Sequence, residues 1–258
     1  MNKKMIIFDI DGTLVDNVNH KIHSSTISCL NKLALNGNVL VIASGRHFAN
    51  INNIDEIKHL FNNYILINGT QIISNESIIY KNVYDKKELK PLLEGLEKEN
   101  IAYACVSKND VYANKTNEIV KYAYSLFGLY EVKVDDEYYL KEEIYQVWCF
   151  GQNEEIKEFS KKYPNLKFLS WGIYGFDVLK HDVSKGCAIK ILAKHLGIDM
   201  KDTIAIGDGL NDIEMIKECN IGIAMGNANE KLKECADYVT DDVSKDGLYK
   251  AFKHLNLI

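Results

Sequence analysis

Two aspartates stand one residue apart where an apolar run near the start of the chain ends. Residues 5–13 read Met-Ile-Ile-Phe-Asp-Ile-Asp-Gly-Thr, and the two acids are Asp9 and Asp11. Such a run is typical of a strand buried on both faces of a parallel sheet, and open α/β sheets bind ligands outside the carboxyl ends of their strands. One carboxylate at that edge could attack a substrate or hold a cation, while the other carries a proton. The alternative is a simple turn at Asp11-Gly12.

Three later segments also place polar side chains at the ends of predicted strands or the starts of predicted helices. They are Ala43-Ser44-Gly45-Arg46, Val183-Ser184-Lys185-Gly186 and Gly207-Asp208-Gly209-Leu210-Asn211-Asp212. A hydroxyl and free N–H groups at Ser44-Gly45 suit a phosphate, and Lys185 adds a charge that can reach a phosphoryl oxygen. Asp208 and Asp212 add carboxylates of the kind that Mg²⁺ prefers.

Each of these segments also has a structural interpretation. Ser44 could be a helix cap, Lys185 an exposed lysine, and Gly207-Asp208-Gly209 a tight turn. The four groups nevertheless fall in order at the same edge of one predicted sheet, which favours a joint chemical role.

Strand-like and helix-like segments alternate at both ends of the chain, which predicts an α/β fold with a parallel sheet and helices on both faces. The expected strands are 5–9, 39–43, 64–67, 203–206 and 221–224, and the expected helices are 24–36, 48–61, 185–196, 211–217, 229–234 and 247–254.

The middle of the chain differs, because short strands mix there with helices expected near 87–100, 117–127 and 154–163. This pattern predicts an α+β domain inserted into the α/β domain. We expect a core of residues 1–81 and 181–258 and an insert of 82–180. The many aromatic residues of the insert are expected to form its core, and Trp171 and Tyr174 are the better candidates to face a substrate.

Composition limits the possible partners. The net charge of −5 argues against a nucleic-acid binder, and the apolar runs are too short to span a bilayer. The chain starts directly on a predicted strand without a signal-like apolar segment, and its six cysteines form no Cys-x-x-Cys pair. We therefore expect a cytoplasmic protein with reduced thiols, no membrane association, and a monomer or small homo-oligomer.

Taken together, the four groups resemble the motifs of the haloacid dehalogenase (HAD) superfamily of phosphohydrolases. That pattern is Asp-x-Asp-x-Thr, then Ser or Thr, then Lys, then Gly-Asp-x-x-x-Asp. Residues 67–70 (Ile-Asn-Gly-Thr) and 224–228 (Ala-Met-Gly-Asn-Ala) look like segments of Cof-type phosphatases, with Thr70 where Ala is usual. The resemblance implies a Rossmann-like, doubly wound parallel sheet with a type-IIB α+β cap inserted after the third strand.

The resemblance also implies roles for individual residues. Asp9 would be the nucleophile and form an aspartyl-phosphate, and Asp11 would be the general acid and base. Mg²⁺ would be held by the carboxylates of Asp9 and Asp208 and by the backbone carbonyl of Asp11. The phosphoryl oxygens would be held by Ser44, Lys185, Asn211 and the Gly45 amide. Arg46 would touch the substrate or pair with a helix carboxylate. Asp212 would anchor metal-bound water or Lys185.

The function expected from these features is a Mg²⁺-dependent phosphatase that acts on small phosphorylated metabolites, with hexose phosphates favoured. Two alternatives stay open. A phosphosugar mutase or phosphotransferase would pass the same phosphoryl group to a second sugar. A non-catalytic metabolite sensor would share the fold, although its motifs would be expected to be broken.

Overall fold

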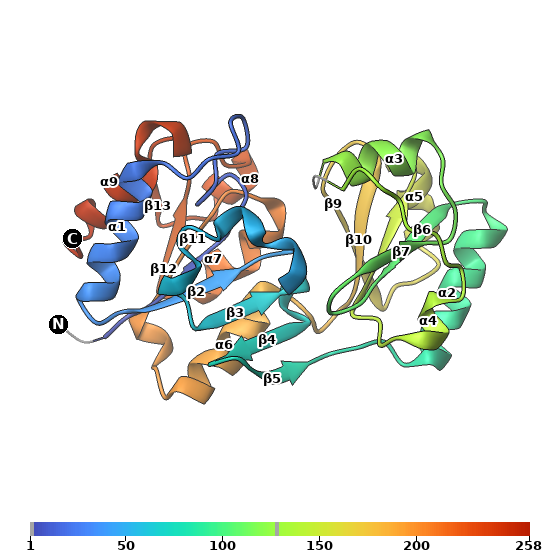
Figure 1. Ribbon diagram of the computed structural model, residues 1–258, viewed down its shortest axis with the longest axis horizontal. Helices are drawn as coiled ribbons and strands as arrows, with labels where there is room; N and C mark the ends of the chain where they lie inside the picture. The colour runs from blue at the N-terminus through green and yellow to red at the C-terminus, as the bar shows by residue number, and fades with distance from the viewer. Residues whose placement is uncertain (1–2, 127–128) are drawn as a thin grey trace. The chain divides into compact units, whose positions relative to one another are not determined.

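The structure is a computed structural model that describes residues 3–126 and 129–258, and it forms two compact units. One unit combines the residues up to Tyr80 with Ser184–Ile258, and the other is Lys81–Val183 (Figure 1). The first unit is therefore built from both ends of the chain.

The sheet of the first unit has the strand order β13-β12-β11-β1-β2-β3-β4-β5. Its neighbours from β13 to β3 pair in parallel, and β4 pairs antiparallel with β3. The strands are β1 (Met5–Phe8), β2 (Val39–Ala43), β3 (Asn63–Leu66), β4 (Gln71–Ser74), β5 (Ser77–Lys81), β11 (Thr203–Gly207), β12 (Ile221–Ala224) and β13 (Tyr238–Val239). Every residue of β1 is fully buried, as its continuous apolar run predicts for a central parallel strand. The predicted α/β class and doubly wound parallel core are confirmed.

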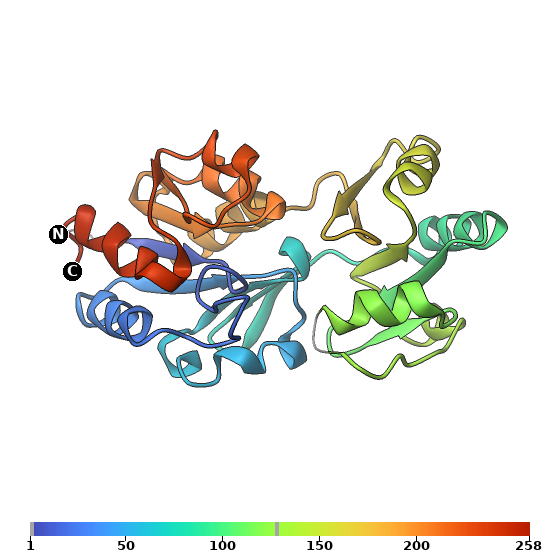
Figure 2. The same ribbon diagram turned by 90° about the horizontal axis from the view of Figure 1, so that it is seen from above.

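Helices cover both faces of this sheet. Helix α1 (Ser24–Leu35) packs on β2 and on α9 (Gly247–His254), while α6 (Lys185–Leu196) packs on β3, β4 and α7 (Ile213–Glu218). Figure 2 shows the blue helix α1 and the orange helices on opposite sides of the sheet. The short helix α8 (Glu230–Lys233) follows β12.

The prediction of a helix at 48–61 is wrong. Three separate 3₁₀ turns occupy this segment instead, at Phe48–Asn50, Asn52–Ile54 and Lys58–Leu60. The sequence Asn-Ile-Asn-Asn-Ile-Asp over residues 50–55 explains the difference, because Asn and Asp form local turns with their own backbone and β-branched residues lower helix propensity.

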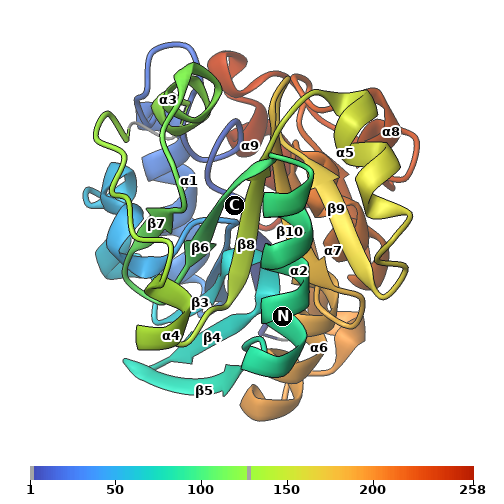
Figure 3. The same cartoon turned by 90° about the vertical axis from the view of Figure 1, so that its right-hand side faces the viewer.

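The second unit is an antiparallel sheet with helices, as expected for an α+β insert. Its strand order is β7-β6-β8-β10-β9, and the strands are β6 (Ala102–Val106), β7 (Val111–Ala113), β8 (Gln146–Phe150), β9 (Leu166–Ser170) and β10 (Gly175–Lys180). The helices are α2 (Lys86–Lys98), α3 (Glu118–Ser125), α4 (Tyr138–Lys141) and α5 (Asn153–Ser160). Phe127, the expected end of the helix near 117–127, lies outside the described residues. Figure 3 shows α2 and α5 in front of the second sheet. Leucines of α2 and Ile156 and Phe159 of α5 form the buried core of this unit together with side chains from the strands.

No helix within residues 3–126 and 129–258 is long and apolar enough to cross a membrane. The six cysteines are free, and four of them are buried.

Candidate active site

The site begins at the carboxyl ends of three neighbouring parallel strands. Asp9 follows β1, Ser44 follows β2, and Asp208 follows β11. Because β11, β1 and β2 lie next to one another in parallel, these three residues leave the sheet at the same edge. The Asp9 N–H continues the ladder by donating to the Ile206 carbonyl at 3.1 Å.

Lys185 lies at the centre of the site although it comes from the other side of the insert. Its Nζ is 2.6 Å from Asp9 Oδ1 and 2.6 Å from Asp212 Oδ1, and its side chain is fully buried. The residue starts helix α6, whose N-cap Ser184 accepts a hydrogen bond from the Cys187 N–H. The interpretation of Lys185 as an exposed lysine is therefore wrong.

Asp212 is a fixed anchor for its neighbours. Its Oδ1 accepts from Lys185, and its Oδ2 accepts from the backbone N–H groups of Asp208 at 3.0 Å and Gly209 at 2.9 Å. A Cβ at residue 207 would lie 2.5 Å from Asp212 Oδ2, so Gly207 leaves the space that this carboxylate occupies. The structure thus places Asp212 in contact with Lys185, one of its two expected roles.

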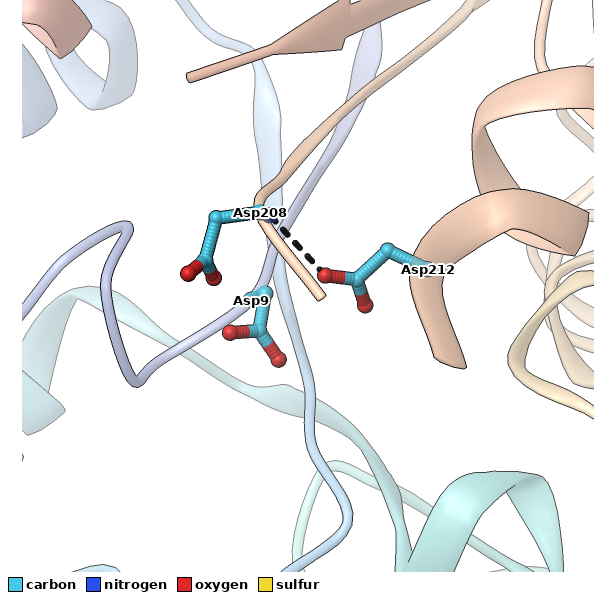
Figure 4. Close-up of side chains that lie close together, drawn as sticks. All are labelled: Asp9, Asp208 and Asp212. Carbon is cyan, nitrogen blue, oxygen red and sulfur yellow. Dashed lines mark hydrogen bonds between the residues drawn. The ribbon is translucent and has the colours of Figure 1, made fainter. Parts of the chain in front are cut away.

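Three carboxylates converge beside this lysine. Asp9, Asp208 and Asp212 each offer an oxygen, and these oxygens lie within 4.8 Å of one another (Figure 4). Oxygen donors of this kind suit a hard divalent cation. The oxygens of the fully buried Asp212 accept from Lys185 and from two backbone N–H groups at 2.6–3.0 Å, whereas the donors to the two Asp208 oxygens lie at 3.4 and 3.5 Å. Asp9 and Asp208 are therefore the pair better placed to hold such an ion. When all three carboxylates are ionised they outnumber the single ammonium, and a cation would neutralise the excess negative charge.

The protonation of Asp9 and Asp208 reflects this crowding. Burial, followed by the Asp212 charge, raises the pKa of Asp9 to about 7, although Lys185 opposes the rise. Burial and the Asp9 charge raise the pKa of Asp208 to about 9. Burial lowers the pKa of Lys185, but Asp212 and Asp9 outweigh it and raise that pKa overall. The lysine therefore stays charged, and the protons on the acids are ones that a cation would displace.

Asp11 forms a two-pronged ion pair with Arg46. Nε donates to Asp11 Oδ2 at 2.8 Å and Nη2 donates to Oδ1 at 2.9 Å, so the flat edge of the guanidinium faces the carboxylate. Arg46 also donates from Nη1 to the Asn50 carbonyl at 3.3 Å. Asp11 was not predicted from the sequence as the partner of Arg46, because Arg46 was expected to contact either a substrate or a helix carboxylate.

The groups expected to hold phosphate are linked through Asn68. Its N–H donates to the Ser44 carbonyl at 3.1 Å, and its Oδ1 accepts from Asn211 Nδ2 at 3.0 Å. A Cβ at Gly45 would lie 3.2 Å from the same Oδ1. Ser44, Gly45 and Asn211 therefore lie around one buried amide. Sequence reasoning gave Asn68 no role, although the Ile67-Asn68-Gly69-Thr70 segment was a signal that could have found it.

Gly12 allows the loop after Asp11 to pack closely against the acid cluster, which consists of Asp9, Asp208 and Asp212. Its φ of +76° is a left-handed conformation that favours glycine, and a Cβ there would overlap Asp208 Oδ2. The adjacent Thr13 hydroxyl donates to Asp208 Oδ1 at 3.4 Å. The loop that carries Asp11 is thus packed against the carboxylate of Asp208.

The doubly wound core brings an aspartate pair, a buried lysine and a second acidic loop together at one edge of its sheet. This arrangement is typical of a phosphoryl-transfer hydrolase. The chain belongs to the haloacid dehalogenase-like hydrolases, since the model of that family matches residues 6–252. The predicted membership in the HAD superfamily, among Cof-type phosphatases, is confirmed.

Individual relatives cover the chain almost end to end. YkrA of Bacillus subtilis (strain 168) is 34% identical over 263 residues, which is 100% of both chains. The 5-amino-6-(5-phospho-D-ribitylamino)uracil phosphatase YcsE of the same organism is 28% identical over 97% of this chain and 95% of its own.

Solved structures agree with these relatives. The HAD subclass IIB sugar phosphatase BT4131 is 35% identical with a TM-score of 0.92, covering 99% of this chain and 100% of its own. BT1666 from Bacteroides thetaiotaomicron is 29% identical with a TM-score of 0.93, covering 99% and 96%. The chain is accordingly a phosphoric monoester hydrolase of the HAD type, and the substrates of this family are small phosphorylated molecules. Phosphatases of the family use a divalent metal, with which the acid cluster is compatible.

Proposed function

We propose that this protein is a Mg²⁺-dependent phosphatase of small phosphorylated metabolites, with hexose phosphates as the favoured class, acting through an aspartyl-phosphate on Asp9. The observation that carries the proposal is the position of the Asp9 carboxylate, 2.6 Å from the buried Lys185 ammonium and within the acid cluster of Asp208. The similarity to a subclass IIB sugar phosphatase supports the substrate class.

Electrostatics explain why Asp9 needs these neighbours. A carboxylate that attacks a phosphate dianion is repelled by roughly 4 kcal/mol per like-charge pair at about 4 Å and an effective dielectric of about 20. Lys185 offsets part of this repulsion next to the attacking oxygen. Asp9, Asp208 and the backbone carbonyl of Asp11 would hold Mg²⁺, which supplies the remaining positive charge beside the phosphoryl group.

Asp11 carries the proton in the proposed reaction. As the Asp9 oxygen bonds to phosphorus, the bond from phosphorus to the leaving oxygen breaks, and Asp11 gives its proton to that oxygen. Asp11 then takes a proton from the water that attacks the aspartyl-phosphate, which releases inorganic phosphate and restores Asp9.

The phosphoryl oxygens are assigned to groups around Asn68. We propose that the Ser44 hydroxyl, the Gly45 amide and Asn211 bind them together with Lys185, and that Arg46 lies beside this group. Backbone and side-chain donors fixed before the substrate arrives are the usual means of stabilising developing charge.

The second unit is proposed to be a type-IIB cap formed by residues 82–180. The structure favours a packing role for Trp171, because its ring stacks against Gly175 and lies 5.7 Å from the Trp148 ring. Tyr174 contacts Tyr122 at 5.9 Å between ring centroids. Substrate contacts by Trp171 and Tyr174 stay predictions, as do a cytoplasmic location and a monomer or small homo-oligomer.

The test is phosphate release by the Asp9→Asn variant from p-nitrophenyl phosphate, with and without Mg²⁺. We expect turnover to be abolished while the protein stays folded, and Asp199→Asn, an exposed aspartate outside the site, to match the unaltered protein. Near-normal turnover by Asp9→Asn would refute the assignment of the nucleophile.

A panel of hexose phosphates then identifies the acceptor. Release of inorganic phosphate supports hydrolysis, whereas an isomerised sugar phosphate without release supports the phosphosugar mutase or phosphotransferase. A protein that binds these compounds without turning over any of them would be a sensor.

A further inference from the structure

Arg46 is the only arginine among the 31 basic residues of the chain. The other basic residues are lysines, and lysines form ion pairs both on the surface and in the core. Lysine is a compact point charge, whereas the arginine guanidinium is a rigid planar fork that can grip both oxygens of a carboxylate. Arg46 is therefore the single residue of this sequence that can contact a carboxylate with a planar fork.

Both the backbone and the guanidinium of Arg46 are anchored. Its backbone N–H donates to Ser44 Oγ at 3.1 Å, and its guanidinium Nη1 donates to the Asn50 carbonyl at 3.3 Å. Nε and Nη2, the edge suited to bidentate contact, face Asp11. The Arg46 side chain is only 12% exposed, while that of Asp11 is 39% exposed. A largely buried, multiply anchored cation thus holds an acid that remains open to an incoming molecule.

This geometry separates two roles for Arg46. If Arg46 binds the phosphoryl group, its bidentate edge must leave Asp11 when substrate arrives. If it orients Asp11, a contact to one carboxyl oxygen persists when Asp11 is protonated, and the other oxygen presents its proton to the leaving oxygen without a search over rotamers. The two short charge-assisted bonds favour the second role.

We infer that Arg46 is a positioning residue that holds Asp11 in the orientation needed for proton transfer. The inference rests on the proposed function, in which Asp11 is the general acid and base. Arg46 exchanges no proton and forms no bond to substrate in this role. Its loss should therefore affect the reaction in proportion to how much the leaving group needs a proton.

Two aryl phosphates test this dependence on the full-length protein. Phenolate must be protonated as it leaves, whereas the far less basic p-nitrophenolate leaves without help. For Arg46→Lys we expect kcat/KM on phenyl phosphate to fall by about 10- to 100-fold, and the ratio of kcat/KM on phenyl phosphate to that on p-nitrophenyl phosphate to fall by about tenfold. Lysine keeps the positive charge, so the change reports the loss of the fork.

Asp11→Asn is the reference variant. It should show a larger change of the same ratio, and Arg46→Lys combined with Asp11→Asn should show no further change, because both substitutions remove one function. An equal fall on both substrates, with the circular dichroism of a folded protein, would overturn the inference and place Arg46 on the phosphoryl group. Additive losses in the double variant would overturn it as well. Absence of turnover in the unaltered protein would instead refute the proposed function.

Discussion

Lys185 and Asp212 form an ion pair whose two side chains are both fully buried, with 2.6 Å between Nζ and Oδ1. The same ammonium lies 2.6 Å from Asp9, so one fully buried lysine pairs with two carboxylates. Burying charges is costly, and breaking such a group by removing one member leaves the others uncompensated. The arrangement therefore links stability to the residues proposed for catalysis.

Replacing Lys185 by Met is expected to destabilise the fold as well as to abolish turnover. At alkaline pH the substitution leaves Asp9 and Asp212 facing each other, and we expect the free energy of unfolding to fall by about 3–5 kcal/mol. Lys190→Met on the same helix α6 is the matched control. Its ion pair with Glu218 also measures 2.6 Å but is largely exposed, so stability should hardly change. Urea denaturation measures both, and equal losses would contradict the prediction.

The raised pKa values of Asp9 and Asp208, about 7 and about 9, predict how stability changes with pH. The unfolded chain releases these protons near pH 4, whereas the folded protein keeps them, so the free energy of unfolding without metal should fall as the pH rises from about 4 to about 9. Melting temperatures in the presence of a chelator check this direction.

Mg²⁺ should counteract that loss, because a cation competes with the protons on these two carboxyls. We expect the rise in melting temperature on adding Mg²⁺ to be larger at about pH 9 than at about pH 6. In Asp208→Asn, whose amide does not titrate, this pH-dependent gain should shrink. An identical gain at both pH values in the unaltered protein would argue against these two acids as the metal site.

Gly12 and Gly37 offer a matched pair for testing the acid cluster. Both have a left-handed φ, +76° and +79°, but a Cβ at Gly12 would overlap Asp208 whereas one at Gly37 meets nothing within 4 Å. Gly37→Ala should cost only the backbone strain, about 1–2 kcal/mol, and leave metal binding unchanged. Gly12→Ala should cost more and weaken metal binding at least about tenfold. Calorimetric titration with Mg²⁺ would show whether the two variants differ.

Asn227 should support the same carboxylate from a different loop. Its Nδ2 donates to the Gly12 carbonyl at 2.8 Å and lies 3.5 Å from Asp208 Oδ2, and its Oδ1 accepts from the Val243 N–H at 2.9 Å. We expect Asn227→Ala to weaken Mn²⁺ binding by about 10- to 100-fold, measured by electron paramagnetic resonance. Asn229→Ala, which removes only the cap of α8, should bind Mn²⁺ as the unaltered protein does. Similar affinities for the two variants would exclude the support role.

The positions of the site residues follow from the strand pattern. Parallel strands end at one edge, so Asp9, Ser44 and Asp208 could be placed together once the strands before them had been recognised. Lys185 could be added because a helix was expected to start there. These inferences depend on local sequence and on one general property of α/β sheets.

Contacts within the site could not be predicted in the same way. The pairing of Arg46 with Asp11 depends on the path of the loop around Gly12 and on the orientation of a long side chain. The hydrogen bonds from Asp208 and Gly209 to Asp212 require the space beside Gly207. The prediction of a helix at 48–61 was wrong for a local reason, since the asparagines of this segment favour turns.

The first unit completes itself without the insert. Strands β1 and β11, which come from opposite sides of Lys81–Val183 in the sequence, pair directly, and the Gly69 backbone packs so closely on the Ser184 carbonyl that a side chain would not fit. The two parts of the first unit are therefore held together by direct contacts with each other. An insert attached in this way can be rewritten or exchanged during evolution without rebuilding the acid cluster, so descendants can inherit one chemistry and acquire different preferences.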